Sequence, residues 1–219
     1  MRTEEPLKSD DAATRSDGVY ERLREAIVTG RVRPNERLVE TELADWLKVS
    51  RTPIRESLNR LAVEDLVMSR RRGWVVREHS GDEIRQIYET RAALESYCAR
   101  LAAERASEAQ LAEIASLHRD NKGISTSSRE HLVNVNDRFH DAIISAAQNE
   151  RLFYMVRKNR TYYFNFRIAE LYSDEETQAA LAGHEAIVCC LLDRDPNRAE
   201  HEMRAHIDAA LKVILAKIR

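Results

Sequence analysis

Residues 18–78 pass through three helical patterns and one hairpin pattern, and this order limits the folds open to the chain. Apolar residues recur at helical spacing, interrupted by Gly30 and by Pro34, which cannot continue a helix, and then give way to short strand-like runs. The predicted helices cover residues 18–29, 40–47 and 50–62, and the predicted strands cover 66–69 and 74–76 with a turn at 70–73. Three short helices followed by a hairpin are the order of a winged helix-turn-helix.

The third predicted helix carries side chains that suit DNA recognition. Ser50 is a favourable N-cap, and Arg51, Thr52 and Arg55 follow within the first turn and a half. Side chains at that end of a helix can reach base edges and phosphates when the helix enters a major groove. The positive end of the helix dipole also favours phosphate.

The predicted turn between the two strands is strongly basic. Its residues suit an adjacent minor groove or the phosphate backbone, and they are Arg70, Arg71, Arg72 and Gly73. Residues 18–80 hold 13 Lys and Arg against 10 Asp and Glu, a mild excess that permits a nucleic-acid contact without establishing one. A solvated surface explains any one of these arginines equally well, but the whole set favours DNA binding.

Residues 81–219 are predicted to be helical throughout. The chain contains only 6 Gly and 4 Pro, so few residues break helices. The predicted helices cover 81–105, 108–122, 128–147, 150–172, 176–193 and 197–217. Residues 1–17 lack hydrophobic periodicity and are predicted to be a flexible tail. The expected fold is mainly α, with a winged helix-turn-helix over 18–79 and an all-α helical bundle over 81–219, divided near residues 78–82.

Three histidines in the second domain have a spacing that can bring them together. His184 and His206 each lie 11 residues from Asp195, so the two are level in an antiparallel hairpin of helices that turns there. His140 and Asn136 share one face of another helix because they are four residues apart. Together these side chains form an N3O set suited to a divalent transition metal. From spacing alone, ordinary surface or partly buried histidines remain the favoured alternative.

The run from Val19 to Val76 closely resembles the GntR family of bacterial transcription regulators, and SRTPIRESLNRLAVEDLV, beginning at Ser50, is its most specific part. The resemblance implies that this run contains the recognition helix and the start of the wing. It implies that Arg51, Thr52 and Arg55 contact bases or phosphates and that Thr41 approaches DNA from the preceding helix. Gly73 would lie at the wing tip, where a glycine permits a tight turn.

Residues 81–216 resemble the FCD domain of the FadR-type branch of these regulators. The resemblance implies a metal site formed by Asn136, His140, His184 and His206, holding a divalent transition metal such as Zn or Ni. Many members have Asp at the position of Asn136, and an amide oxygen binds without charge. A metal-free pocket, in which protonated histidines supply the positive charge, is the alternative.

The same resemblance gives Arg91 a role in binding a carboxylate effector, to which a guanidinium is well suited. The alternative is an ion pair with Glu95, four residues later on the same helix. Tyr162, Tyr163, Phe164 and Phe166 are expected to line the core or the pocket in alternation. Adjacent helical residues point about 100° apart, so one of Cys189 and Cys190 is expected in the core.

The sequence therefore predicts a ligand-responsive bacterial DNA-binding regulator, acting as a repressor and as a homodimer on an operator in double-stranded DNA. Its effector is expected to be a small organic acid. An odd count of three cysteines, no apolar run near the roughly 20 residues of a membrane span, and a polar N-terminus predict a cytoplasmic protein with no membrane contact. The alternatives are a three-histidine metalloenzyme and a purely structural metal site.

Overall fold

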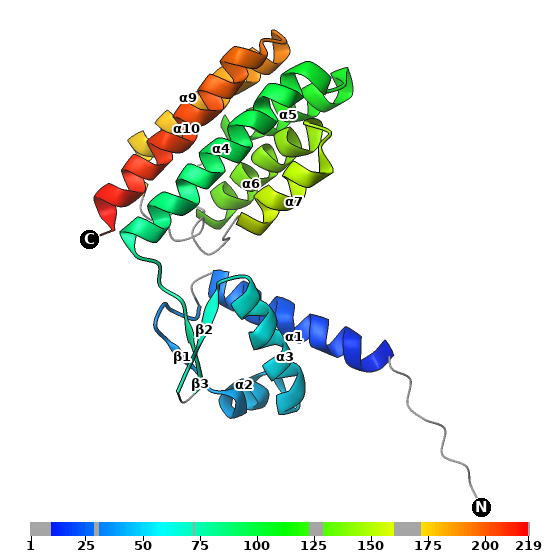
Figure 1. Cartoon of the computed structure of the whole chain (residues 1–219), viewed down its shortest axis with the longest axis vertical. Coiled ribbons are helices and arrows are strands. Elements are labelled where there is room, and N and C mark those ends of the chain that lie inside the picture. The colour runs from blue at the N-terminus through cyan, green and yellow to red at the C-terminus, as the bar shows by residue number, and fades with distance from the viewer. Residues whose placement is uncertain (1–9, 29–30, 72, 123–128, 160–171, 219) are drawn as a thin grey trace, which may run out of the picture. The chain divides into compact units, whose positions relative to one another are not determined.

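The computed structural model describes residues 10–28, 31–71, 73–122, 129–159 and 172–218. The chain divides into two compact units, residues 1–78 and 79–219 (Figure 1). Within its described residues the first unit combines three helices with a small sheet, and the second is helical wherever it is described, apart from short connections. A mainly α chain with an N-terminal winged helix-turn-helix and an all-α second domain is confirmed.

The first unit contains α1 (Asp10–Val28), α2 (Glu40–Leu47) and α3 (Arg51–Val63), with β1 (Arg37–Leu38), β2 (Val67–Arg70) and β3 (Gly73–Val76). The strands form one antiparallel sheet in the order β1-β3-β2, in which Arg70 pairs with Gly73 at the hairpin turn. The two-residue strand β1 was not predicted. Two residues are too few for an alternating pattern, so β1 is defined only by its pairing with β3.

The start of the first helix was predicted incorrectly. Residues 10–17 belong to α1 rather than to a tail, whereas residues 1–9 lie outside the described residues. Residues 10–17 lack the apolar spacing seen from Val19 onward, so periodicity does not reveal this end of the helix. Once the buried part of a helix has formed, each added residue gains a backbone hydrogen bond, which allows the helix to extend beyond its apolar stripe.

A small apolar core holds α1 against α3 and orients the third helix. The large side chains buried in this core include Leu23, Ile27, Ile54, Leu58 and Leu61. Burying a side chain of this size contributes about 1.5–3 kcal/mol to stability. Because the apolar stripe of α3 faces inward, Arg51, Thr52 and Arg55 are left exposed on its opposite side.

The second unit contains α4 (Gly81–Arg105), α5 (Glu108–Lys122), α6 (Arg129–Ala146), α7 (Glu150–Asn159), α9 (Asp174–Leu192) and α10 (Pro196–Lys217). Capping boxes begin α4 and α9, formed by Ser80 with Glu83 and by Ser173 with Glu176. The predicted helix over 150–172 is observed only as α7, because residues 160–171, with Tyr162, Tyr163, Phe164 and Phe166, lie outside the described residues.

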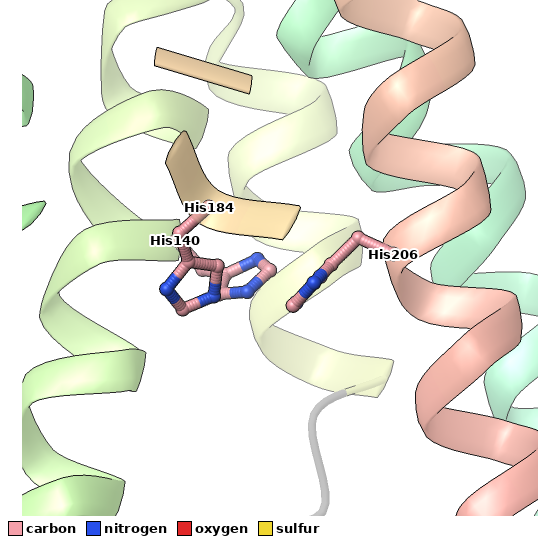
Figure 2. A group of neighbouring side chains, drawn as sticks. All are labelled: His140, His184 and His206. Atoms are coloured by element: carbon pink, nitrogen blue, oxygen red, sulfur yellow. The ribbon is translucent and has the colours of Figure 1, made fainter. Parts of the chain in front are cut away.

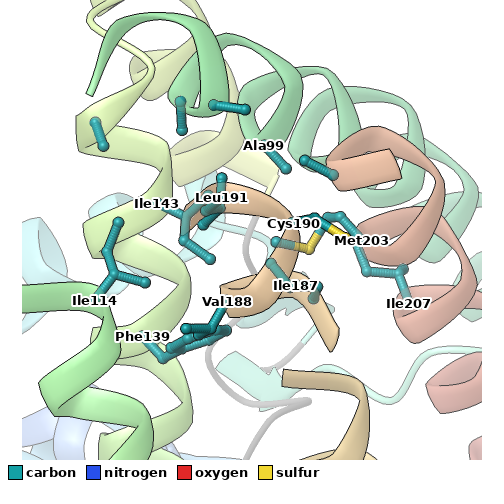
Figure 3. Packing of buried hydrophobic residues seen from close by; sticks show 14 of the residues in the cluster. Ala99, Ile114, Phe139, Ile143, Ile187, Val188, Cys190, Leu191, Met203 and Ile207 are labelled. Carbon is teal, nitrogen blue, oxygen red and sulfur yellow. The ribbon is translucent and has the colours of Figure 1, made fainter. Parts of the chain in front are cut away.

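A large core cluster joins α4, α5, α6, α9 and α10 (Figure 3), and a smaller one packs Val156 of α7 against α4 and α6. Small alanines on α4, such as Ala99 and Ala102, allow α10 to pack close along its length (Figure 1). Larger side chains from α5, α6, α9 and α10 fill the remaining space, among them Ile114, Phe139, Ile143, Ile187, Leu191 and Met203 (Figure 3). Cys190 is part of this core and Cys189 is exposed, as adjacent helical positions predict.

The described helices include none that is both long enough and apolar enough to cross a membrane.

Candidate functional site

Three histidines from three helices meet inside the second unit (Figure 2). His140 comes from α6, His184 from α9 and His206 from α10. One potential ligand atom of each side chain lies within 4.8 Å of those of the other two. The rings of His184 and His206 have centroids 4.6 Å apart, as their equal distances from the turn at Asp195 predict. That turn is held by the Asp195 side chain, which accepts a hydrogen bond from the Arg198 backbone N at 3.0 Å.

His184 is buried among aromatic rings. Its ring stacks on Phe139 with centroids 4.3 Å apart, and within the described residues neither of its ring nitrogens has a hydrogen-bond partner. Burial and the neighbouring His206 hold the pKa of His184 well below its ordinary value, and burial lowers the pKa of His206 to about 3. Both imidazoles are therefore neutral near pH 7. Neutral imidazoles with unused nitrogens can serve as metal ligands.

A buried carboxylate connects this group to Arg91. Glu95 Oε2 accepts a hydrogen bond from His140 Nδ1 at 2.9 Å, and Glu95 Oε1 accepts one from Arg91 Nε at 3.1 Å. With Nδ1 as the donor, a neutral His140 carries its lone pair on Nε2, the atom that remains for a metal. The sequence spacing predicted the contact of Glu95 with Arg91 but not the contact with His140.

Arg91 is buried and lies close to the histidines. The guanidinium sits over the Tyr88 ring, 4.8 Å from its centroid. Although burial opposes it, the Glu95 carboxylate raises the pKa of Arg91 above its ordinary value. The positive charge of Arg91 also contributes to the lowered pKa of His206, after burial and the neighbouring His140. The ion pair between Arg91 and Glu95 is thus present, and it places a fixed cation beside the three histidines.

Gly183 makes room for His206. A Cβ at this position would lie 2.8 Å from His206 Nδ1, closer than real Cβ contacts. A glycine inside a helix lowers stability by about 0.5–1 kcal/mol relative to alanine. Here the missing side chain allows the His206 ring to lie against the backbone of α9. The sequence contains Gly183 directly before His184, but only the pairing of α9 with α10 reveals its role.

Asn136 lies one helical turn before His140 on α6 and is partly buried. Its Nδ2 donates to Asp137 Oδ1 at 3.4 Å, which makes the amide oxygen the atom suited to a metal. His140, His184 and His206 lie close together, and the place of Asn136 among the ligands stays a prediction.

The residues predicted to contact DNA lie on one end of α3, on α2 and on the β2–β3 turn. Arg51, Thr52 and Arg55 are exposed, as are Thr41 on α2 and Arg70 and Arg71 at the turn, while Arg72 lies outside the described residues. Ser50 occupies the N-cap of α3, but its side chain makes no capping hydrogen bond to the described first turn. Gly73 begins β3 with φ of 120°, a backbone conformation that favours glycine.

Comparison with known protein families accounts for both units. The family described as "Bacterial regulatory proteins, gntR family" matches residues 15–76, and the FCD domain matches residues 86–209. The chain belongs to the GntR family of bacterial transcription regulators. This GntR regulator is 32% identical over 188 residues to the Nta operon transcriptional regulator of Aminobacter aminovorans, covering 85% of the chain and 88% of that protein.

A second relative agrees with this assignment, and a solved structure shares the fold. The regulator is 27% identical to the HTH-type transcriptional repressor GlaR of Escherichia coli, covering 92% of the chain and 96% of GlaR. A putative GntR transcriptional regulator from Rhodococcus sp. RHA1 has the same fold, with a TM-score of 0.76 at 23% identity over 94% of this chain and 100% of that one. Because the relatives are transcriptional regulators, the enzyme alternative is set aside and the protein is a regulator.

Proposed function

We propose that this GntR regulator binds an operator and represses transcription, and that it releases the operator DNA when a small carboxylic acid binds the second unit. The observation that carries this proposal is the enclosed group of His140, His184 and His206 with Arg91 beside it. Imidazole nitrogens and a guanidinium form a site for a metal and an anion. The acid would release the DNA if it bound more tightly to a conformation of the protein that binds the operator weakly.

The DNA contact is assigned to the exposed face of α3 and to the wing. Arg51, Thr52 and Arg55 would enter the major groove, with Thr41 approaching from α2. The wing residues Arg70, Arg71, Arg72 and Gly73 would contact the phosphate backbone or the minor groove. One winged helix offers a small contact area, so a homodimer reading two half-sites in the cytoplasm completes the proposal.

Arg51→Ala and Arg55→Ala are expected to weaken operator binding. If each guanidinium makes a bidentate base contact, each substitution should cost on the order of 1–3 kcal/mol. The measurement is fluorescence anisotropy at fixed salt, with a duplex enriched by the wild-type protein from a randomised library. Arg85→Ala is the matched control, because Arg85 is also an exposed arginine but belongs to α4 of the second unit rather than to the proposed DNA interface. Unchanged affinity in both α3 variants would exclude this helix from the interface.

The residues present fit a divalent metal. His184 has buried nitrogens without hydrogen bonds among the described residues, His206 is accommodated by Gly183, and Glu95 orients His140. We propose that His140, His184 and His206 hold a Zn or Ni ion, with the Asn136 oxygen as a fourth ligand. When bound, the metal would supply a positive centre for the carboxylate of the effector.

Arg91 would bind the effector from the other side of the site. A second carboxylate or another oxygen of the acid would compete with Glu95 for the guanidinium, and this exchange would alter the contacts of α4 with α6. A purely structural metal is the rival. Titration of dicarboxylic and hydroxycarboxylic acids into the protein bound to its selected duplex separates the two, because a sensor releases the DNA and a structural site does not respond.

Asn136→Asp should strengthen metal binding, because a charged oxygen replaces a neutral one. We expect an increase of about tenfold, or about 1.4 kcal/mol, with weaker carboxylate binding per bound metal because the site is less positive. Calorimetry with Zn²⁺ or Ni²⁺ and then with the acid measures both. Asn134→Asp, which adds the same charge at an exposed position of α6, is the control. Equal metal affinities in the two variants would remove residue 136 from the ligand set.

A further inference from the structure

Two of the arginines assigned to DNA share one carboxylate. Arg55 Nε donates to Glu40 Oε1 at 3.1 Å, and Arg55 Nη2 donates to Glu40 Oε2 at 2.8 Å. Arg51 Nη2 donates to the same Oε2 at 3.3 Å. Glu40 is the first residue of α2, so it reaches the start of α3 across the helix-turn-helix.

The carboxylate lies beneath the two guanidiniums. The Glu40 side chain is 18% exposed, whereas those of Arg51 and Arg55 are 60% and 58% exposed. The arginines therefore cover the acid and present their outer edges to the solvent. Among the donors of a guanidinium, a contact through Nε and Nη2 leaves the Nη1–Nη2 edge of Arg55 for a bidentate partner such as guanine O6 and N7.

A carboxylate at this position opposes simple attraction to DNA. Each phosphate neutralised by a basic side chain strengthens sequence-independent binding, and Glu40 offsets part of that charge. A surface evolved only for phosphate binding gains nothing from such an acid. The acid does restrict the directions of two long side chains, and this restriction reduces the conformational entropy that is lost when they meet a base.

We propose that Glu40 is a specificity-determining positioning residue, which aims Arg51 and Arg55 at base edges and suppresses their binding to phosphate. This inference rests on the proposed DNA interface. The hydrogen bond from Arg55 also holds the pKa of Glu40 below its ordinary value, so the carboxylate stays ionised at neutral pH. Glu40 is then expected to lower affinity for arbitrary DNA while raising discrimination between sequences.

The test compares Glu40→Gln with Glu42→Gln, which removes the same charge from an exposed position on α2. Anisotropy titrations use the selected duplex and a scrambled duplex of identical composition over a range of salt concentrations. Glu40→Gln should reduce the ratio of the two affinities about tenfold, the size expected when one bidentate base contact is weakened. It should also bind the scrambled duplex more tightly, with a salt slope steeper by about one.

A second variant separates charge from geometry. Glu40→Asp keeps the charge but shortens the reach, so discrimination should fall while the salt slope on scrambled DNA stays near the wild-type value. Circular dichroism melting of each variant establishes that it is folded. If Glu40→Gln matches Glu42→Gln in both ratio and slope, the inference is wrong although the DNA interface stands. If Arg51→Ala and Arg55→Ala also leave binding unchanged, the interface itself is wrong and the inference falls with it.

Discussion

Glu95→Ala is expected to destabilise the second unit by on the order of 3–5 kcal/mol, the loss typical of breaking one side of a buried ion pair. Glu95 is fully buried and is the hydrogen-bond partner of both Arg91 and His140. Without the carboxylate, Arg91 keeps its charge in an environment that excludes water. Urea unfolding followed by far-UV circular dichroism measures the loss.

Two further variants test whether the loss of stability in Glu95→Ala comes from the buried ion pair. Glu89→Ala removes an exposed acid from the same helix and should change the free energy of unfolding by no more than about 0.5 kcal/mol. Glu95→Leu combined with Arg91→Met removes both charges and should recover much of the loss, because well-packed apolar side chains often replace a buried pair without cost. If Glu95→Ala is as stable as Glu89→Ala, Arg91 does not depend on this carboxylate.

Gly183→Ala is expected to disrupt the histidine site without removing any ligand. The added Cβ would lie 2.8 Å from His206 Nδ1 and 3.5 Å from His206 Cγ, so the ring must swing away from α9. We expect metal affinity to fall on the order of 100-fold, the upper range for substitutions that misorient a metal-binding histidine. Stability should change little, because alanine favours the helix by up to about 1 kcal/mol and offsets part of the strain.

Calorimetric titration of metal-stripped protein with Zn²⁺ tests this expectation. Gly81→Ala is the matched control, since a Cβ there would meet Leu215 Cδ2 at an ordinary 3.8 Å. His184→Ala, which removes a whole proposed ligand, gives the loss of Zn²⁺ affinity with which the Gly183→Ala result is compared. Wild-type affinity in Gly183→Ala would show that His206 is not a metal ligand.

Several features of the regulator follow from local sequence. Helical periodicity predicted α2 and most of α3, and the consecutive turn residues predicted the β2–β3 hairpin, because each pattern depends only on neighbours a few residues apart. The facing positions of His184 and His206 also followed, since the turn at Asp195 sets the register of α9 against α10. The pair of Arg91 with Glu95 required only the four-residue spacing of one helix.

Other features required the folded chain. Strand β1 exists because β3 pairs with it, and α1 extends to Asp10 beyond its apolar stripe. Glu40 lies 15 residues from Arg55, and Glu95 lies 45 residues from His140, so no local pattern connects either pair. From the sequence, Gly183 is only a residue that weakens a helix. Its role appears once the folded chain places His206 against it.

The sequence by itself determined most of the helices, the hairpin, the family and the types of side chain proposed to bind DNA and a metal. Only the tertiary structure decided which acids accompany those side chains, with Glu40 beneath Arg51 and Arg55 and Glu95 between Arg91 and His140. The physical reason is that periodicity and capping are set by short-range backbone geometry. The partner of a charged group is set by which helices pack together, and that packing reflects the burial of apolar surface along the whole chain.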